Sequence, residues 1–383
     1  LLADLELNIP ATALAKDLSV SQLQAVEIAK AVSYDARIII MDEPTSSLTN
    51  AETRHLFKII RRLKSEGRSI IYISHKLEEL FEISDEITVM RDGTYVGRYP
   101  IEEISIDELI KLMVGRSMEN RFPPNEHVVQ PNVLLKVENF TSADPHSFKG
   151  MSFDLHKGEI LGIGGLVGAQ RTELVESVFG LRSIAEGKLY KNGQEIVNSN
   201  PQEAIKNGFA MLTEERRATG IIPMLSVMDN TLAVAFKAMA GNRFGILNPK
   251  KLQTDVEKIN GELNVKTPSV KTAIQNLSGG NQQKVLICRW LLANSDILIL
   301  DEPTRGIDVG AKYEIYRIMR ELTKAGKSII MVSSEMPELI GVSDRIMVMC
   351  EGRMTGILDA AEVEQTDVMT LATQSENKAK AVD

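Results

Sequence analysis

Residues 297–304 read ILILDEPT, in which four apolar residues are followed at once by two carboxylates, a proline and a threonine. An apolar run of this length is typical of a short strand buried on both faces of a parallel sheet. Because the carboxyl ends of parallel strands share one edge of the sheet, we expect Asp301 and Glu302 at that edge. The alternative is a pair of solvated acids that only ends a buried strand.

The same pattern occurs a second time as IIIMDEPT at residues 38–45. LSVSQ at 18–22 likewise matches LSGGN at 277–281. His75, after one apolar run, matches Ser334 after another. The separation is 259 residues each time (277 − 18, 301 − 42 and 334 − 75), which indicates an internal repeat.

Both copies alternate helix-like and strand-like segments, which predicts an α/β fold with a parallel sheet at its core. The Pro- and Asn-containing segment 120–132 is the expected linker, after a first copy at 1–119. The second copy is expected at 133–376, followed by a polar, frayed tail at 377–383.

The two copies differ in length ahead of their matching motifs. Val133 lies 144 residues before Leu277, whereas Leu1 lies only 17 residues before Leu18. About 127 residues of the first copy, including any phosphate loop of its own, are therefore expected upstream, so the first copy is incomplete.

The composition argues against several classes of protein. A net charge of −8 and a pI near 5.4 do not suit a duplex-binding surface, so no nucleic-acid partner is expected. Cys288 and Cys350 provide neither a disulfide framework nor metal-ligand spacing. The apolar runs are far shorter than the ~20 residues needed to span a bilayer, so any work at a membrane would be peripheral.

GLVGAQRT at 165–172 follows the apolar run EILGIG and precedes a helix-like stretch. It partly matches the phosphate loop G-x-x-x-x-G-K-[ST], whose backbone N–H groups surround phosphates. Gly165 and Thr172 fit the first and last positions, with Gly168 between them. Gln170 and Arg171 stand where glycine and lysine belong. A glycine-rich turn that closes a buried strand is the alternative.

LSGGNQQK at 277–284 has the pattern of a helix start that attracts phosphate. Ser278 can cap the helix, and Gly279 and Gly280 leave its first N–H groups unblocked. Asn281 and Gln282 follow in the first turn. An ordinary capped helix would explain the serine but not two glycines, each of which weakens a helix start by up to roughly 1 kcal/mol.

Together, LSGGNQQK, the two DEPT strands and SH after a strand resemble the ATP-binding cassette (ABC) ATPases, a family of P-loop NTPases. More narrowly, LVGAQRTE, LTEERRATGI, DEPTRGIDVGAK and SSEMPEL resemble the second half of tandem ATPases that drive bacterial monosaccharide import. The resemblance covers nearly the whole chain. It implies a parallel sheet core with a helical subdomain, at about 222–275 in the second copy, and ATP and Mg²⁺ as cofactors.

The resemblance also implies that each ATP lies between the phosphate loop of one copy and the signature of the other. In the first site, Asp42 would hold Mg²⁺, Glu43 would polarise the attacking water and His75 would sense the γ-phosphate. The second copy would lend this site its signature and D-loop, namely Ser278, Gly279, Gly280, Asn281, Gln282 and Asp308. The second site would combine Gly165, Gly168, Gln170, Arg171, Thr172, Glu214, Asp301, Glu302 and Ser334. There, Asp301 and Thr172 would be the metal ligands and Glu214 would occupy the Q-loop position.

Nearly every departure from the family pattern falls in the second site. The planar guanidinium of Arg171 is no substitute for a lysine point charge. Val20 and Ser21 replace the signature glycines, Thr49 replaces the D-loop aspartate, and Ser334 is too short to do the work of a histidine. We therefore expect the first site to hydrolyse ATP and the second to hold nucleotide without turnover. The present chain, without a first phosphate loop, should show negligible turnover alone.

The implied partners are a transmembrane permease dimer and, indirectly, a periplasmic sugar-binding protein, with the ATPase peripheral on the cytoplasmic face of the bacterial inner membrane. The copies could pair within one chain or in a homodimer of tandem chains. Galactose or methyl galactoside is the favoured sugar, with ribose, xylose or arabinose as alternatives. A soluble tandem ABC ATPase and a nucleotide-binding scaffold without turnover are the rival classes. Phe140 or Phe148 could stack on adenine, although a place in the core is favoured for both.

Overall fold

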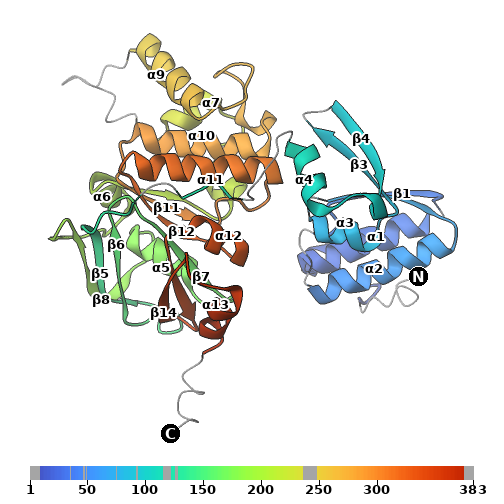
Figure 1. Cartoon of the computed structure of the whole chain (residues 1–383), viewed down its shortest axis with the longest axis horizontal. Coiled ribbons are helices and arrows are strands. Elements are labelled where there is room, and N and C mark those ends of the chain that lie inside the picture. Colours follow the sequence, from blue (N-terminus) through green and yellow to red (C-terminus); the bar gives the residue numbers. More distant parts are fainter. Residues whose placement is uncertain are drawn as a thin grey trace, which may run out of the picture. The chain divides into compact units, whose positions relative to one another are not determined.

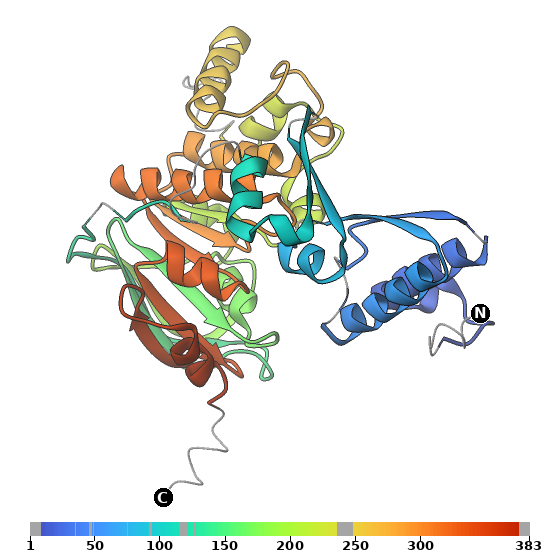
Figure 2. The same cartoon turned by 45° about the vertical axis from the view of Figure 1, so that its right-hand side comes forward.

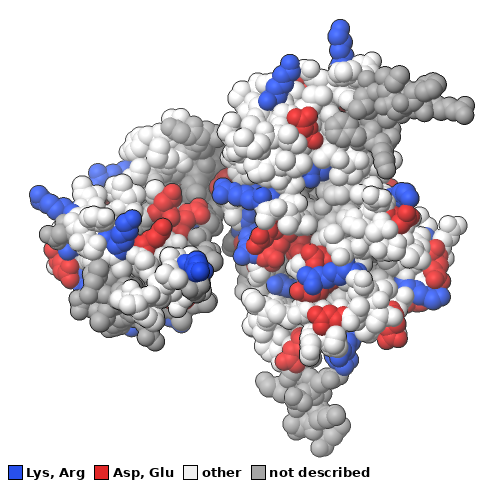
Figure 3. All heavy atoms as spheres, turned by 180° about the vertical axis from the view of Figure 1, so that it is seen from behind, with Lys and Arg blue, Asp and Glu red and all other residues white. Residues whose placement is uncertain are grey.

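The computed structural model describes residues 9–34, 36–45, 48, 50–74, 76–91, 94–114, 122–125, 128–235 and 248–374. The chain divides into two compact units, Leu1–Met118 and Glu119–Asp383 (Figure 1). No helix in the described part of the chain is both long and apolar enough to cross a bilayer. On the face drawn in Figure 3, acidic and basic side chains are interspersed over the surface.

A six-stranded sheet lies at the centre of the larger unit. Its strands are β7 (Ile160–Gly165), β10 (Phe209–Leu212), β11 (Ile297–Asp301), β12 (Ser328–Val332), β13 (Arg345–Cys350) and β14 (Arg353–Asp359). The order is β10-β11-β12-β7-β13-β14, with every neighbouring pair parallel except β13 and β14. All residues of β11 and β12 are buried, as expected of apolar strands covered on both faces.

A four-stranded antiparallel sheet completes the strand layers of the larger unit. It consists of β5 (Val133–Ser142), β6 (Met151–His156), β8 (Ile184–Lys191) and β9 (Gln194–Ile196), in the order β6-β5-β8-β9. Phe140 and Phe148 are 2% and 0% exposed and belong to the core shared with the six-stranded sheet. Both rings therefore occupy the favoured core position and present no face to a ligand.

Helices pack around the central sheet and extend beyond one end of it. They are α5 (Arg171–Val178), α6 (Pro201–Lys206), α7 (Val227–Leu232), α9 (Pro249–Glu262), α10 (Gly279–Leu292), α11 (Val309–Lys324), α12 (Met336–Val342) and α13 (Gln365–Ala372). Figures 1 and 2 show α7, α9 and α10 gathered beyond α11, which matches the expected helical subdomain. Arg289 joins α10 to α7, because its Nε donates to the carbonyl oxygen of Asn230 at 2.7 Å.

The smaller unit repeats part of this plan. Its elements are α1 (Val20–Ser33), β1 (Ile38–Asp42), α2 (Asn50–Ser65), β2 (Ser69–Ile73), α3 (Leu77–Ile83), β3 (Glu86–Arg91), β4 (Thr94–Pro100) and α4 (Ile106–Val114). Their counterparts, in order, are α10, β11, α11, β12, α12, β13, β14 and α13, and each begins 259 residues later (279 − 20, for example). The separation read from the sequence motifs is thus also the separation of the elements.

The two units differ in how their parallel strands are covered. Ile38, Ile40 and Ile71 of β1 and β2 are 62%, 66% and 51% exposed, whereas their counterparts in β11 and β12 are completely buried. In the larger unit, the covering is supplied by the common core that includes β7 and α5. Among the described residues of the smaller unit, nothing corresponds to that strand and helix.

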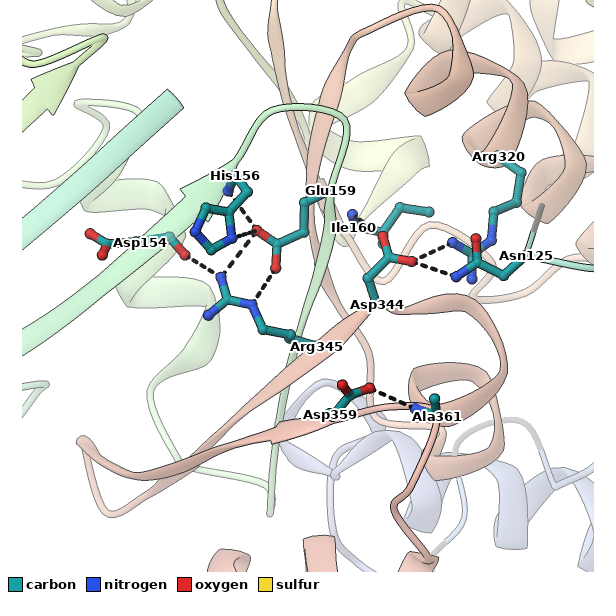
Figure 4. Close-up of polar contacts among 10 residues, drawn as sticks. All are labelled: Asn125, Asp154, His156, Glu159, Ile160, Arg320, Asp344, Arg345, Asp359 and Ala361. Carbon is teal, nitrogen blue, oxygen red and sulfur yellow. Dashed lines mark hydrogen bonds and ion pairs between the residues drawn. The ribbon is translucent and has the colours of Figure 1, made fainter. Parts of the chain in front are cut away.

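A charged cluster lies at the amino ends of β7 and β13 (Figure 4). Arg345 pairs with Glu159 at 2.6 Å, and Arg320 Nη1 donates to Asp344 Oδ1 at 2.8 Å. Asn125, from the segment before β5, also donates to Asp344 Oδ1, at 2.7 Å. Because these carboxylates are paired and lie at the opposite end of the strands from residues 165–172, the cluster joins segments of the fold.

Candidate functional site

The loop of residues 165–172 connects β7 to α5 and has the backbone of a phosphate loop. Gly165 has a φ of 154°, and a Cβ there would lie 2.4 Å from the carbonyl oxygen of Met349. Gln170 precedes α5 in the left-handed conformation, with a φ of 70°. A residue with a Cβ pays roughly 1–2 kcal/mol for that conformation, which explains why glycine is usual at this position. The loop has kept its shape despite the glutamine.

The side-chain amide of Gln170 is hydrogen-bonded within the protein at both its oxygen and its nitrogen. Its Oε1 accepts a 2.9 Å hydrogen bond from Ser147 Oγ, and its Nε2 donates to the carbonyl oxygen of Gly168 at 3.3 Å. Gly168 itself has a φ of 86° and open space where a Cβ would be. The glutamine is therefore engaged with the protein rather than held free for a ligand.

Arg171 stands where the phosphate-loop pattern has a lysine, but its side chain is bonded to a neighbouring loop. Its Nη1 donates a 2.8 Å hydrogen bond to the carbonyl oxygen of Ser333, at the end of β12. Its positive charge also lowers the pKa values of Asp301 and Glu302, partly offsetting the effect of burial. The guanidinium thus joins two loops and balances two carboxylates.

Asp301 ends β11 and is completely buried. Neither carboxylate oxygen has a hydrogen-bond partner among the described residues, although Thr172 lies close enough to offset part of the pKa increase. Burial raises the pKa of Asp301 to about 6. A buried carboxylate without a partner beside a hydroxyl fits the oxygen ligands that Mg²⁺ prefers. Neither here nor elsewhere in the described ranges do three or more His, Cys, Asp or Glu residues form a group that could hold a metal by themselves.

Glu302 is held in a strained turn directly after this strand. Its φ is 47°, and its N–H donates to the carbonyl oxygen of Val332 at 3.0 Å. Ser334 Oγ donates to Glu302 Oε2 at 3.1 Å, and burial raises the pKa of Glu302 to about 7. Glu43 has the same backbone in the smaller unit, with a φ of 45° and a 2.8 Å bond from its N–H to Ile73.

Glu214, at the expected Q-loop position, forms an ion pair with Arg305. The sequence prediction named Glu214 as a site residue but missed Arg305. The signal available was the arginine directly after DEPT, since that loop must leave the same sheet edge as the carboxylates. The pairing means that part of the charge on Glu214 is already balanced by the protein.

The signature segment begins α10, but one detail of the prediction was wrong. Ser278 is the N-cap residue, yet its side chain accepts no hydrogen bond from the helix backbone. Instead, Asn281 Nδ2 donates to Ser278 Oγ at 2.9 Å, while Asn281 Oδ1 accepts from the N–H of Lys266 at 2.7 Å. The polar side chain of Asn281 lies within reach of the serine and bonds to it in place of the helix N–H groups.

Close packing accounts for Gly280 and gives Gly279 a weaker constraint, since an arginine side chain can move away. A Cβ at Gly280 would lie 2.4 Å from Ala311 Cβ, so α10 and α11 could not approach so closely with a larger residue. A Cβ at Gly279 would lie 2.9 Å from an Arg216 guanidinium nitrogen. Gln282 is only 4% exposed, and its Oε1 accepts from Arg216 Nε at 3.1 Å.

Asp308 is the N-cap of α11, where its Oδ1 accepts from the N–H of Ala311 at 2.8 Å. Its carboxylate is thus hydrogen-bonded within its own unit.

The larger unit brings one group of predicted residues together at the carboxyl ends of its parallel strands. This group consists of Gly165, Gly168, Gln170, Arg171, Thr172, Asp301, Glu302 and Ser334. No hydrogen bond or ion pair within the described segments joins Ser278 or Asn281 to this group. In the smaller unit, Asp42 ends β1 and is followed by Glu43, while His75 and Thr49 lie outside the described residues. Val20 and Ser21 begin α1.

A phosphate loop after β7, carboxylates after β11 and a helical subdomain that carries LSGGN define an ATP-binding cassette. Residues 148–305 match the family model described as ABC transporter. A solved ATP-binding cassette of an ABC transporter has a TM-score of 0.55 at 20% identity, covering 63% of this chain and 99% of that chain. A Clostridium perfringens protein, part of an ABC transporter complex, has a TM-score of 0.52 at 21% identity, covering 66% and 98%. These likenesses confirm the predicted α/β P-loop fold.

Curated proteins match over nearly the whole chain. The galactose/methyl galactoside import ATP-binding protein of Clostridium tetani is 58% identical over 98% of this chain and 74% of its own length. Proteins of the same description from Sodalis glossinidius and Escherichia coli are 53% and 51% identical, over 93% and 96% of this chain and 70% and 72% of their lengths. The chain belongs to this family of ABC transporter ATP-binding proteins.

Proposed function

We propose that the chain is the ATP-hydrolysing subunit of an ABC importer that takes up galactose or methyl galactoside across the bacterial inner membrane. The observation that carries this proposal is the 58% identity with an import ATP-binding protein over 98% of the chain. Ribose, xylose and arabinose are the alternative sugars. No observation on the described residues favours a soluble tandem ATPase or a scaffold without turnover.

ATP is the nucleotide, and we propose Mg²⁺ as its metal. Asp301 and Thr172 would hold the ion in the larger unit, and Asp42 would do so in the smaller. When bound, Mg²⁺ would neutralise charge on the β- and γ-phosphates. The support in this chain is the buried carboxylate of Asp301, which has no partner among the described residues.

The two sites would have different roles, hydrolysis in the first and nucleotide binding in the second. In the first, Glu43 would orient a water and accept its proton as the water oxygen bonds to the γ-phosphorus and the bond to the ADP oxygen breaks. This site would be completed by His75 and by residues of the second repeat, namely Ser278, Gly279, Gly280, Asn281, Gln282 and Asp308. The copies could pair within one chain or between two chains.

The second site would hold nucleotide without hydrolysis. Arg171 is bound to the backbone of Ser333, and Ser334 is bound to Glu302. Both groups are therefore engaged with the protein at the positions where the family pattern has a lysine and a histidine. Glu214, paired with Arg305, would lie beside the phosphates.

The proposed partners are a permease dimer and, through it, a periplasmic sugar-binding protein, with this subunit peripheral on the cytoplasmic face. In the helical subdomain, Ile222, Met224 and Leu225 are 48%, 77% and 41% exposed. These apolar residues precede α7 and suit a groove that receives a permease helix. We also propose that the first copy ends near residue 119 and that the second spans 133–376.

The experiment that tests this proposal measures ATP turnover in a chain extended to the length of its relatives, in membranes that contain the permease. Galactose with its binding protein should stimulate turnover. Glu43→Gln should abolish turnover, and Glu302→Gln should leave most of it. The opposite result for the two variants would reverse the assignment of the sites, and turnover that no sugar stimulates would exclude the importer.

A further inference from the structure

A buried glutamate connects two loops in the larger unit. Glu338, on α12, is 1% exposed. Its Oε1 accepts a 2.8 Å hydrogen bond from Thr304 Oγ1, and its Oε2 accepts one from Ser333 Oγ. Thr304 lies within the turn that begins with Glu302 and is closed by the N–H of Arg305, and Ser333 precedes Ser334. One carboxylate therefore joins the two loops that carry these site residues.

The smaller unit contains the same arrangement. Glu79, on α3, is 8% exposed, and its Oε2 accepts hydrogen bonds from Thr45 Oγ1 at 2.8 Å and from Ser74 Oγ at 3.3 Å. Thr45, Ser74 and Glu79 are 259 residues before Thr304, Ser333 and Glu338 (304 − 45, for example). Ser74 directly precedes position 75. The connection is thus present in both copies, although their other site residues have diverged.

The glutamate of the smaller unit also has a cation and a tyrosine beside it. Lys76 Nζ lies 3.2 Å from Glu79 Oε1 and donates to the carbonyl oxygen of Thr45 at 3.1 Å. Tyr72 donates its hydroxyl hydrogen to Glu79 Oε2 at 2.8 Å. A buried carboxylate with a cation and several donors is well compensated, so breaking the cluster is costly.

The same positions in the larger unit carry Glu335 in place of Lys76 and Met331 in place of Tyr72. Lys312 pairs there with Glu335 instead of with Glu338. Burial raises the pKa of Glu338, and the hydroxyls of Ser333 and Thr304 and the charge of Lys312 offset part of the rise. The copy whose glutamate is assigned to hydrolysis is the copy in which a lysine lies within ion-pair distance of the buried carboxylate.

The cluster around Glu79 lies beside the strained backbone turn at Glu43. A left-handed conformation at a residue with a side chain persists only where the surroundings hold it in place. The N–H of Glu43 is bonded to Ile73 at the end of β2, and Thr45, two residues further on, is bonded to Glu79. These two bonds on either side of the turn fix Glu43 relative to Ile73 and to α3.

We infer that Thr45 and Glu79 are positioning residues for hydrolysis, because their hydrogen bond holds the strained Glu43 turn against the loop that follows β2. The inference rests on the proposed function of Glu43. Thr304 and Glu338 keep the corresponding turn in the larger unit, where less depends on its geometry.

The test replaces the hydroxyl without changing the shape of the side chain. In the extended chain with its permease, Thr45→Val should lower kcat by at least about 10-fold with KM changed less than about twofold, since a misplaced catalytic group loses rate rather than affinity. Thr45→Ser, which keeps the hydroxyl, should restore kcat to within about threefold of wild type. Thr304→Val, the matched change in the other copy, should lower kcat much less than Thr45→Val.

Hydrogen exchange supplies a readout that does not depend on turnover. The Glu43 amide should exchange at least about 10-fold faster in Thr45→Val than in wild type, and Thr45→Ser should restore its protection. Wild-type kcat in Thr45→Val, or an equal loss in Thr45→Ser, would overturn the inference. If Glu43→Gln retains full turnover, the proposed function of the first site fails, whereas the exchange rates still decide whether the threonine holds the turn.

Discussion

The Nη1 atom of Arg171 donates a 2.8 Å hydrogen bond to the carbonyl oxygen of Ser333, so one side chain joins the loop after β7 to the loop after β12. A lysine at this position of a phosphate loop would extend toward the β- and γ-phosphates. Here the cation is bonded to the protein and lies near Asp301 and Glu302. The arginine thus contributes to holding the two loops together.

Arg171→Ala should therefore destabilise the larger unit even without nucleotide. The variant removes the partner of the Ser333 carbonyl and the cation near buried Asp301 and half-buried Glu302, a loss of roughly 1–3 kcal/mol. Denaturant unfolding at pH 7 measures it. Arg171→Lys, which keeps the charge but not the planar donor, should lose less. Equal stability of wild type and Arg171→Ala would show that the hydrogen bond contributes nothing.

The pKa of Glu302 predicts a dependence of stability on pH. Burial raises this pKa to about 7, against about 4.3 in an unfolded chain, so the folded state binds the proton more tightly. Stability due to this group is therefore greatest below pH 4 and falls as the pH rises toward 7. Glu302→Gln should raise Tm by roughly 3–6 °C at pH 8, corresponding to roughly 1–2 kcal/mol, and change it little at pH 4.

The control for this measurement is Glu362→Gln, because Glu362 is exposed and lies outside the site. It should leave Tm nearly unchanged at both pH values. A gain for Glu302→Gln that is as large at pH 4 as at pH 8 would mean that the effect is not due to the charge on Glu302.

Much of the fold follows from local patterns, and much of the site does not. The apolar run before Asp301 and the repeat distance of 259 residues predict the buried strands and their recurrence in the two copies, since periodicity and burial are local properties, whereas the order of the strands in the sheet comes from the structure alone. The contact between Arg171 and Ser333 joins residues 162 positions apart. No spacing rule could predict that the arginine bonds to a carbonyl there.

Ser278 shows the same limit at short range. The sequence places it correctly at the N-cap of α10, but its hydroxyl accepts from Asn281 instead of from the helix backbone. In the other copy, Ser19 at the start of α1 does form the capping hydrogen bond, with the N–H of Gln22. The difference depends on which side chain competes for the hydroxyl, and this is decided by rotamers that a pattern of residue types does not contain.

Asn230 should be essential for the loop that precedes α7. It is completely buried, its Oδ1 accepts from the N–H of Ile222 at 2.8 Å, and its Nδ2 donates to the carbonyl oxygens of Ile222 and Ser226. Asn230→Ala leaves the N–H of Ile222 without its acceptor, whereas the carbonyl oxygens of Ile222 and Ser226 keep backbone donors, so we expect a loss of roughly 1–3 kcal/mol.

Proteolysis and unfolding together check this prediction. Cleavage near Met224, which is 77% exposed, should become faster in Asn230→Ala because the loop is no longer held. Asn230→Asp keeps Oδ1 but loses the donor and should show an intermediate loss. Unchanged cleavage and stability in Asn230→Ala would refute a role for this side chain in ordering the loop.

Gly341 should be required for the attachment of Phe122 to the larger unit. A Cβ at Gly341, within α12, would lie 2.2 Å from Phe122 Cδ2, and the Phe122 ring packs against Tyr316 with 5.4 Å between ring centroids. Alanine in a helix interior normally gains roughly 0.5–1 kcal/mol over glycine. Gly341→Ala should instead cost roughly 1–3 kcal/mol, because the aromatic ring must move.

Gly261, inside α9, provides the matched control, since a Cβ there would meet nothing within 4 Å. Gly261→Ala should therefore stabilise the chain by the usual helical increment. In a double-mutant cycle, Phe122→Ala should cancel most of the penalty of Gly341→Ala, because the clash requires both side chains. If the two losses simply add, Gly341 acts through something other than its contact with Phe122, and the close approach of the segment before β5 to α12 does not determine stability.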